Sequence, residues 1–152
     1  MVNRQLADFL EQGVGMHMAT RNEALQPNGA RASAIKVTDD GATVVVYVPV
    51  RSAAPLLDDL RHNGQAAVVC VWPPDDRGCQ VKGVFVDAHP AAPEDEALVR
   101  RQWEGFRDSL EAVGLPRAAT DGWLVWPCTA IHLRVTAVFD QTPGPGAGAP
   151  LG

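Results

Sequence analysis

The sequence is poor in cysteine, in basic residues and in long apolar runs. Its three cysteines, Cys70, Cys79 and Cys128, are an odd number without Cys-x-x-Cys spacing, which excludes a disulfide framework and a zinc ribbon. With 13 Lys and Arg against 18 Asp and Glu, the chain lacks the basic face of a nucleic-acid-binding protein. No apolar run approaches the length of a bilayer span. We therefore expect free thiols, and neither nucleic acid nor a membrane as a partner.

The start of the chain also lacks the apolar stretch of a secretory signal. Met1 to Gln5 lead into an acidic amphipathic segment, which is untypical of a signal peptide, so we expect a cytoplasmic protein. The histidines have no metal-like spacing such as His-x-x-x-His. We therefore predict no metal site and a structural or surface role for each of the four, His17, His62, His89 and His132.

What the sequence does contain is the composition of an ordinary globular protein. Its 152 residues are 46% hydrophobic and 20% charged, which fits one domain with one core. The end of the chain, from Thr142 to Pro150, is rich in proline and glycine and cannot build a core of its own. We predict a single domain over 1–140 and a tail over 141–152 that is either mobile or laid over a partner.

Alternation of apolar and polar residues, together with β-branched and apolar runs, predicts six strands. They cover 14–20, 30–37, 43–48, 66–72, 79–87 and 131–139. A turn is expected at Pro27-Asn28-Gly29, and the strands over 30–37 and 43–48 form a hairpin. The last strand has the most regular pattern, with one buried face formed by Ile131, Leu133, Val135, Ala137 and Phe139.

Three segments have helical spacing. The first, over 3–12, ends at Gly13; the second begins with Ser52 as its N-cap and ends at Asn63-Gly64; the third covers 93–113. Strands joined by short turns and separated by helices favour an antiparallel barrel over a parallel sheet. The predicted fold class is mainly β, a six-stranded antiparallel barrel with appended helices.

Two cations interrupt the second strand, Arg31 and Lys36. Cations in an apolar barrel strand are costly unless they meet an anion or remain at the rim. Because side chains alternate along a strand, positions five apart point to opposite faces. One cation could then reach a bound phosphate while the other addresses a substrate or a neighbouring chain. The alternative is a pair of rim charges whose ends reach water.

The order of these features resembles the pyridoxamine 5′-phosphate oxidase-like split barrels that bind flavin mononucleotide (FMN). A helix and a strand are followed by a strand with the Arg-x-x-x-x-Lys pattern and by a Val-rich strand that ends in Tyr. A short helix, a further strand and a Gln-containing strand come next. The resemblance covers 6–87, with 130–139 as the closing strand. The resemblance implies a homodimeric FMN-dependent oxidoreductase with the flavin in a cleft between subunits. It places the cofactor against Arg31, Ala32, Ser33, Ile35, Lys36, Tyr47, Val48, Gln80 and Lys82.

The chain departs from that family in two places. Where the oxidases carry a Ser-Arg-Lys run that grips the flavin phosphate, this chain reads Val50-Arg51-Ser52-Ala53-Ala54, which leaves Arg51 and Ser52 as partial substitutes. The vitamin-phosphate-binding residues have no counterpart in 122–152. We therefore do not expect the vitamin B6 oxidase itself, and the sequence identifies no catalytic residue, since the flavin performs the electron transfer.

Gln80 and Lys82 share one face of their strand and, with Arg31, could surround an anionic ring edge or phosphate; the alternative is that they are solvent-facing polar residues. The segment Trp123-Leu124-Val125-Trp126-Pro127 is too apolar for an exposed surface of a monomer, so we predict it at the dimer interface. Two other functions stay open. One is a non-catalytic module for haem, a deazaflavin or another ligand, and the other is an interaction or stress-related protein without a ligand.

Overall fold

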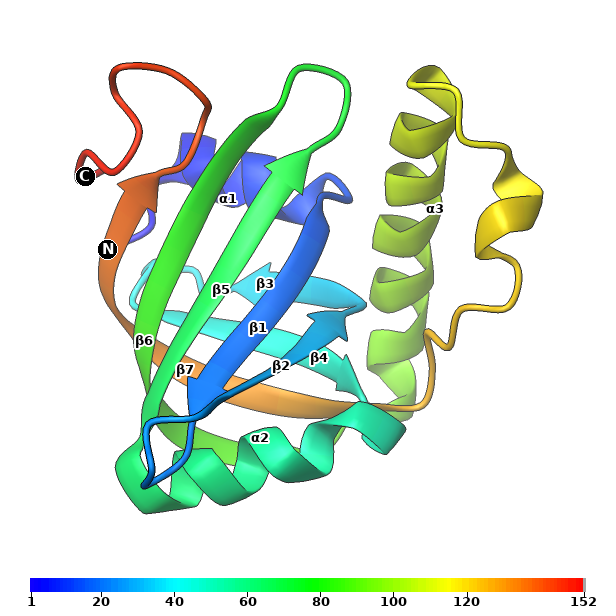
Figure 1. The fold of residues 1–152 in the computed structure, drawn as a ribbon. Coiled ribbons are helices and arrows are strands. Elements are labelled where there is room, and N and C mark those ends of the chain that lie inside the picture. The colour runs from blue at the N-terminus through cyan, green and yellow to red at the C-terminus, as the bar shows by residue number, and fades with distance from the viewer. Residues whose placement is uncertain (152) are drawn as a thin grey trace.

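The computed structural model describes residues 1–151 and shows a curled antiparallel sheet with three α-helices around it (Figure 1). The helices are α1 (Arg4–Glu11), α2 (Val50–Asn63) and α3 (Glu96–Ala112), with 3₁₀ turns at Pro93–Asp95 and Arg117–Thr120. The strands are β1 (Gly15–Arg21), β2 (Pro27–Ala32), β3 (Ala34–Val37), β4 (Thr43–Pro49), β5 (Gln65–Trp72), β6 (Arg77–Pro90) and β7 (Cys128–Asp140). They follow the order β2-β1-β5-β6-β7-β4-β3.

The sheet curls into a barrel because its two outermost strands are consecutive in the chain. β2 pairs with β1 through Ala32 and Met16, and β3 pairs with β4 through Ala34 and Tyr47. Only Ser33 separates them, and its backbone N–H donates to the Tyr47 carbonyl at 2.8 Å. One continuous segment therefore supplies both edges of the sheet, which leaves few unpaired backbone groups.

The observed strands differ from the predicted ones in two places. The strand expected over 30–37 is two strands, so the sheet has seven strands where the pattern predicts six. The turn expected at Pro27-Asn28-Gly29 is also wrong, because these residues begin β2. The chain turns earlier, where the Asn22 N–H donates to the Gln26 carbonyl at 2.9 Å and Leu25 adopts a φ of 61°.

The core has two parts. The barrel interior is closed at its ends by α1 and α2 (Figure 1), which contribute Leu10, Leu56 and Leu60. A second cluster lies on the outer side of the sheet beneath α3, where Val99 and Trp103 pack on β4 and β7. The outer wall of the barrel is thus covered by α3 on one side.

The predicted helices form with small changes at their ends. Asn3 caps α1 by accepting a hydrogen bond from the Leu6 N–H at 2.9 Å, and Gly64 ends α2 with a φ of 70°, a conformation that glycine adopts without strain. Ser52 is not the N-cap of α2. The helix already begins at Val50, after Pro49, and no side chain caps its first turn.

The side-chain alternation of β7 breaks at a bulge. The register with β6 shifts between Lys82 and Gly83, which face Ala137 and Val135. Beyond the shift Val138 is buried, whereas Ala137 and Phe139 are only partly buried. The single buried face predicted through Phe139 is therefore wrong past Val135, because the extra residue of a bulge moves the following side chains to the other face.

Two contacts hold α3 in place. The Gln102 side-chain amide pairs with the backbone of Ile35, accepting from its N–H at 3.0 Å and donating to its carbonyl at 2.7 Å. Near the end of α1, Gly13 and Gly105 lie so close that a Cβ on Gly105 would sit 2.5 Å from the Gln12 carbonyl oxygen. α3 is thus tied both to β3 and to α1.

The proline- and glycine-rich tail folds back along β7 of its own chain. The Leu151 N–H donates to the Val138 carbonyl at 2.8 Å, and the Gly148 N–H donates to the Asp140 carbonyl at 2.7 Å. Leu151 also packs against the barrel core. No helix within residues 1–151 is both long and apolar enough to cross a membrane.

Candidate functional site

Arg31 is the best-positioned of the predicted site residues. Its side chain points to the outer side of the barrel, where its guanidinium carbon lies 5.0 Å from the Trp103 ring centre and 4.8 Å from that of Trp123. Its Nη2 donates to the Leu124 carbonyl at 2.8 Å. Among the described residues no carboxylate forms an ion pair with it. Burial lowers the pKa of Arg31, but an arginine remains charged, so this cation is partly desolvated without an anion.

Ser33 lies on the same side of the barrel as Arg31, and the surroundings of its hydroxyl are unusual. Its Oγ is buried and makes no hydrogen bond in the described part of the chain. The neighbouring thiol is that of Cys128, which donates to the Val125 carbonyl at 3.0 Å. Burial raises the pKa of Cys128 to about 11, an effect that Ser33 and Arg31 partly offset. A buried hydroxyl without a partner is costly, and the Cys128 thiol is the polar side chain that interacts with it.

Tyr47 forms a wall of this site. It is buried beneath α3 with Ala34, Trp103 and Cys128. Burial raises the pKa of the Tyr47 phenol, and the nearby Asp95 carboxylate raises it further. The phenol is therefore a neutral hydrogen-bond donor, held in position by the helix above it.

Three of the predicted cofactor contacts point the other way. Ala32, Ile35 and Val48 all belong to the buried cluster inside the barrel. Since that cluster fills the interior, their side chains do not reach the outer face. Any contribution that they make to a ligand there runs through their backbone atoms.

Arg31 and Lys36 lie on the same side of the sheet. The prediction of opposite faces is wrong because Ser33 interrupts the alternation: Ala32 and Ile35, three residues apart, both point into the barrel. Lys36 is exposed. It lies opposite Val45 on β4, and Val45 lies opposite His132 on β7. It stands apart from the aromatic rings that cover Arg31.

Arg51 and Ser52 occupy the first turn of α2, where both are exposed. This turn contains no acidic residue and no side-chain cap, and the Val50 N–H donates to the Pro127 carbonyl at 3.1 Å. The remaining first-turn amides and the positive end of the helix favour an anion. Val50 is three residues beyond Tyr47, about 10 Å along the chain, so this turn adjoins the Arg31 site.

Gln80 and Lys82 do not join this group within one chain. Across the sheet Arg31 faces His17, His17 faces Val69, and Val69 faces Gln80. Three strand spacings amount to about 14 Å. Both residues lie on the outer face, but at its other side, where the Lys82 Nζ is 4.9 Å from the Phe139 ring centre.

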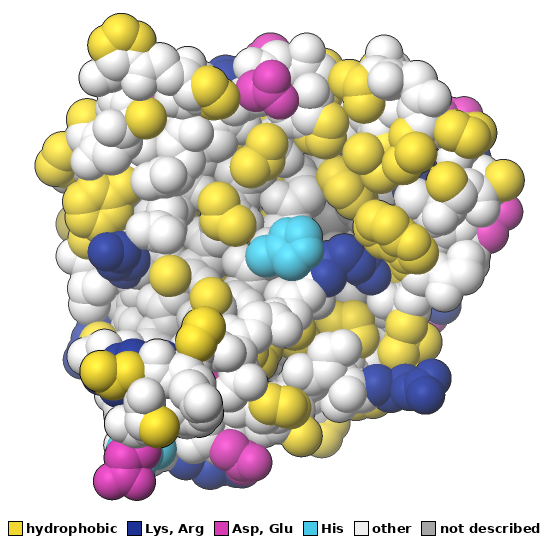
Figure 2. All heavy atoms as spheres, viewed as in Figure 1, with side chains coloured by type: hydrophobic (Ala, Val, Ile, Leu, Met, Phe, Trp, Pro, Cys, Tyr) yellow, Lys and Arg dark blue, Asp and Glu magenta, His cyan; other side chains and the backbone are white. Residues whose placement is uncertain are grey.

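Apart from His17 beside Arg31, the outer face between these two groups is lined by small and apolar residues. Figure 2 views this side of the molecule, and acidic side chains appear there only near the edge of the view. The exposed or partly exposed positions on β1, β2 and β5 include Ala19, Gly29, Ala67 and Val69. Between Arg31 and Lys82 this surface carries the exposed imidazole of His17, next to Arg31, and otherwise small or apolar side chains.

Sequence reasoning missed two participants. Trp103 lies within the third predicted helix, over 93–113, and its ring covers Arg31. Asp95 lies at the start of the same segment and faces Tyr47. No local pattern indicates either contact, because each joins segments far apart in the chain.

A histidine pair lies near the start of α3. The Nε2 atoms of His89 and His132 are 3.0 Å apart, and the His89 Nδ1 is 3.0 Å from the Pro90 carbonyl oxygen. A carbonyl only accepts, so Nδ1 carries the proton, and His132 donates to the free Nε2 of a neutral His89. Burial and the neighbouring imidazole of His89 lower the pKa of His132, opposed by the smaller effects of Asp87 and Asp95.

Lowering the pH from about 8 to about 5.5 is therefore expected to destabilise the protein through His132. Its folded-state pKa lies below the unfolded value near ~6.5, so above that pH the residue is neutral in both states. As the pH falls through the unfolded pKa, the unfolded chain binds the proton and the folded chain resists it. Thermal unfolding of His132→Gln should show a smaller decline over this range, whereas His62→Gln, a change on exposed α2, should match the wild type. Identical slopes for His132→Gln and wild type would contradict this assignment.

Comparison with known proteins identifies the fold. No protein-family model and no curated protein matches the chain. Among solved structures, it is similar to HupZ of Group A Streptococcus, with 16% identity, a TM-score of 0.58 and coverage of 98% of this chain and 99% of that one. It is also similar to a putative pyridoxamine 5′-phosphate oxidase from Lactobacillus delbrueckii, with 9% identity, a TM-score of 0.56 and coverage of 90% and 92%.

An FMN-binding protein from Syntrophomonas wolfei is a third similar structure, with 10% identity, a TM-score of 0.55 and coverage of 90% and 86%. At such identities the likeness concerns the fold and not the activity. It agrees with the curled sheet, the partner exchange at Ser33 and the appended helices. The chain therefore has the split β-barrel fold of the FMN-binding, pyridoxamine 5′-phosphate oxidase-like proteins.

Proposed function

We propose that this protein binds FMN on the outer face of its barrel, in a cleft between two copies of the chain, and acts as an oxidoreductase. The observation that carries the proposal is the state of Arg31: a partly buried guanidinium, placed over two indole rings, with no carboxylate partner among the described residues. Partly desolvated cations are stable where an anion completes the site. The buried Ser33 hydroxyl beside it, which makes no hydrogen bond in the described part of the chain, supports the same conclusion.

The first turn of α2 fits the phosphate of FMN. Helix N-termini bind phosphates through their free amides and the helix dipole, and here the Arg51 guanidinium and the Ser52 hydroxyl add a charge and a donor. These groups adjoin the Arg31 site through Tyr47 and the start of the helix. The turn is weaker than a Ser-Arg-Lys run because Ala53 and Ala54 contribute no side-chain donor.

The Arg31 region would hold the ring system. When bound, the flavin supplies the electron-transfer chemistry. The chain supplies a fixed positive charge at Arg31, which favours negative charge on the part of the ring that it faces. Trp103 and Trp123 keep that charge in position and limit its access to water.

A second copy of the chain would complete the site. Gln80 and Lys82 lie about 14 Å from Arg31 in one chain, too far for a contact with the same atoms. A partner packed on the outer face of β1 and β5 would bring its own Gln80 and Lys82 toward Arg31. The side chains of Trp123 and Leu124, which are 41% and 39% exposed, would be covered by the same partner.

The names of similar structures support FMN, although an F420 reductase, whose cofactor is a deazaflavin, is among them. They include an FMN-binding protein and a putative pyridoxamine 5′-phosphate oxidase. We do not extend the proposal to vitamin B6 oxidation, since the residues for the vitamin phosphate have no counterpart here. A haem or deazaflavin module remains an outcome of the experiment below.

FMN titration of the purified protein tests the proposal. We expect saturable binding with a changed flavin spectrum, together with a dimer in solution. FMN should bind roughly 10- to 100-fold more tightly than riboflavin, because charge-assisted hydrogen bonds to the phosphate contribute ~1.5–3 kcal/mol. Reduction of the bound flavin by a nicotinamide donor would support oxidoreductase activity. A protein that ignores FMN but takes up haem or F420 would refute the assignment.

A further inference from the structure

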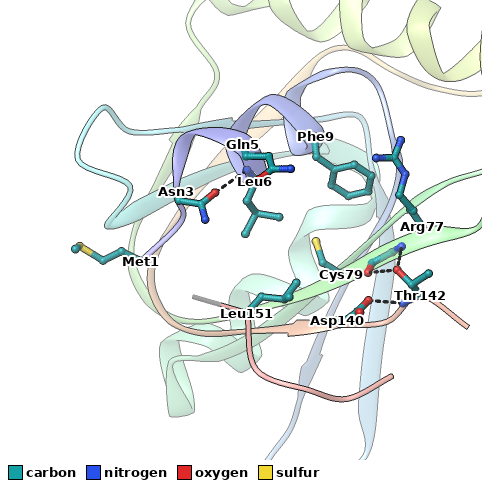
Figure 3. A pocket seen from close by; sticks show the side chains of 11 residues that line it. Met1, Asn3, Gln5, Leu6, Phe9, Arg77, Cys79, Asp140, Thr142 and Leu151 are labelled. Carbon is teal, nitrogen blue, oxygen red and sulfur yellow. Dashed lines mark hydrogen bonds between the residues drawn. The ribbon is translucent and has the colours of Figure 1, made fainter. Parts of the chain in front are cut away.

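A cavity of ≈ 370 Å³ opens between α1, the start of β6 and the C-terminal tail, away from the residues proposed for FMN (Figure 3). Its wall combines apolar side chains with polar and charged ones, among them Asp140. Leu6, Phe9 and Leu151 supply apolar side chains, and Arg77 and Thr142 are among the polar ones. None of the predicted cofactor residues lines it.

The floor of this cavity carries a thiol. Cys79 lines it, and in Figure 3 its sulfur points into the space beneath Leu6. Directly across the β5–β6 ladder from Cys79 lies Cys70. Both side chains are buried in the barrel core, at 2% and 0% exposure, and of the two only Cys79 lines the cavity.

The backbone spacing of this pair suits a disulfide. Residues directly opposite in an antiparallel ladder have Cα atoms about 4.5 or 5.5 Å apart, depending on the pair type. Disulfides need roughly 4.4–6.8 Å, so both cases fall inside the range. The two side chains point to the same face, since register partners do so.

The two thiols are not equivalent. The two facing sulfurs influence each other: the neighbouring Cys70 thiol lowers the pKa of Cys79, whereas Cys79 and burial raise the pKa of Cys70. A nearby Asp140 opposes the change at Cys79. The thiolate is the reactive form of cysteine, so the residue that faces the cavity is also the one favoured as nucleophile.

We propose that Cys79 and Cys70 form a dithiol–disulfide site, oxidised by small uncharged organic disulfides that enter through this cavity. The Cys79 thiolate attacks one sulfur of the disulfide RSSR, which gives a mixed disulfide and releases RS⁻. Cys70 then loses its proton to that RS⁻ and attacks the Cys79 sulfur, which releases the second RS⁻; this takes the proton lost by Cys79. Two protein thiols are oxidised, and one RSSR is reduced to two RSH.

The third cysteine, Cys128, serves as an internal control for oxidation through the cavity. Cys128 lies in the other buried cluster, beneath α3, and its thiol donates to the Val125 carbonyl. It does not line the cavity. Oxidation through the cavity should therefore spare Cys128.

The test uses 2-hydroxyethyl disulfide on the native, full-length protein. Intact-mass measurement should show the loss of two hydrogen atoms, and peptide mapping should link Cys70 to Cys79. Cys70→Ala should stop at a stable mixed disulfide on Cys79, Cys79→Ala should form neither product, and Cys128→Ala should behave as the wild type. A circular dichroism spectrum of each variant confirms that it is folded.

A second variant tests the route of entry. Leu151→Trp at the rim should fill part of the cavity and slow the modification of Cys79 by at least about tenfold, because thiol–disulfide exchange depends on access. Denatured wild type and denatured Leu151→Trp should react at equal rates. Preferred modification of Cys128, a Cys70→Ala variant without an adduct, or a native protein that reacts only after unfolding would each overturn the proposal.

Discussion

Replacing Arg31 with alanine is expected to raise the Kd for FMN by roughly 10- to 100-fold, which corresponds to ~1.5–3 kcal/mol. The reason is that Arg31 is the one partly buried cation of the proposed site that has no carboxylate partner among residues 1–151. Its place over Trp103 and Trp123 holds the charge before any ligand binds. Titration of each variant with FMN, followed by flavin absorbance, measures the change.

Two variants serve as controls for this result. Arg61→Ala removes an arginine from an exposed pair with Asp58 on α2 and should leave FMN affinity unchanged. Arg31→Lys keeps the charge but loses the planar group that lies over the indole rings, so its affinity should fall between those of wild type and Arg31→Ala. An unchanged Kd in a folded Arg31→Ala protein would show that Arg31 does not serve the flavin.

Replacing Gln102 with leucine is expected to lower the free energy of unfolding by about 2–4 kcal/mol. The buried amide of Gln102 pairs with both the N–H and the carbonyl of Ile35. Leucine has a similar size but leaves these two backbone groups buried without partners, and that is more costly than the loss of an average hydrogen bond. Denaturant unfolding followed by circular dichroism measures the change.

Gln5→Leu is the matched control for Gln102→Leu, because it makes the same change at an exposed position of α1 and should shift stability by less than about 0.5 kcal/mol. Gln102 also sets the position of α3, and α3 carries Trp103. Gln102→Leu should therefore weaken FMN binding as well, although it touches no part of the proposed site. Equal stability of Gln102→Leu and wild type would mean that the Ile35 backbone finds another partner.

Local patterns predicted most of the elements correctly. The alternation in 79–87 put Gln80 and Lys82 on one face, and the structure confirms this, since their neighbours Cys79 and Val81 belong to the core. The second helix ends at Asn63-Gly64 as the sequence predicts, and Gly64 has the left-handed conformation that glycine adopts without strain. Such features depend on neighbours within a few residues, so they can be recognised without knowledge of the fold.

The errors lie where distant segments meet. The break at Ser33 depends on a hydrogen bond to Tyr47, fourteen residues later, and it reverses the faces expected for the residues after it. The bulge in β7 depends on the register with β6 around Lys82. Both change which side chains face the barrel, and neither leaves a local trace in an otherwise regular pattern.

For the candidate site, too, the sequence predicted only part of the arrangement. The resemblance proposed Arg31, Ser33, Tyr47, Arg51 and Ser52 together, and the structure places these five along one stretch of the outer face. Of these five, Ser33 and Tyr47 are buried beneath α3, and Arg51 and Ser52 belong to the first turn of α2. The structure places Gln80 and Lys82 three strands away from Arg31 on the outer face, and it turns Ala32, Ile35 and Val48 into the core. The contact between Gln80 and Lys82 of one copy and the Arg31 site of the other copy in a dimer stays a prediction.

The sequence by itself determined the types of element, the inward faces of the regular strands and the presence of cations in an apolar wall, because side-chain periodicity and capping are local. Only the tertiary structure decided that Arg31 lies over two tryptophans, that Ser33 closes the barrel and that Cys70 stands opposite Cys79. Each of these requires a choice of strand partner and register. That choice is made by hydrogen bonding and packing between residues far apart in the chain.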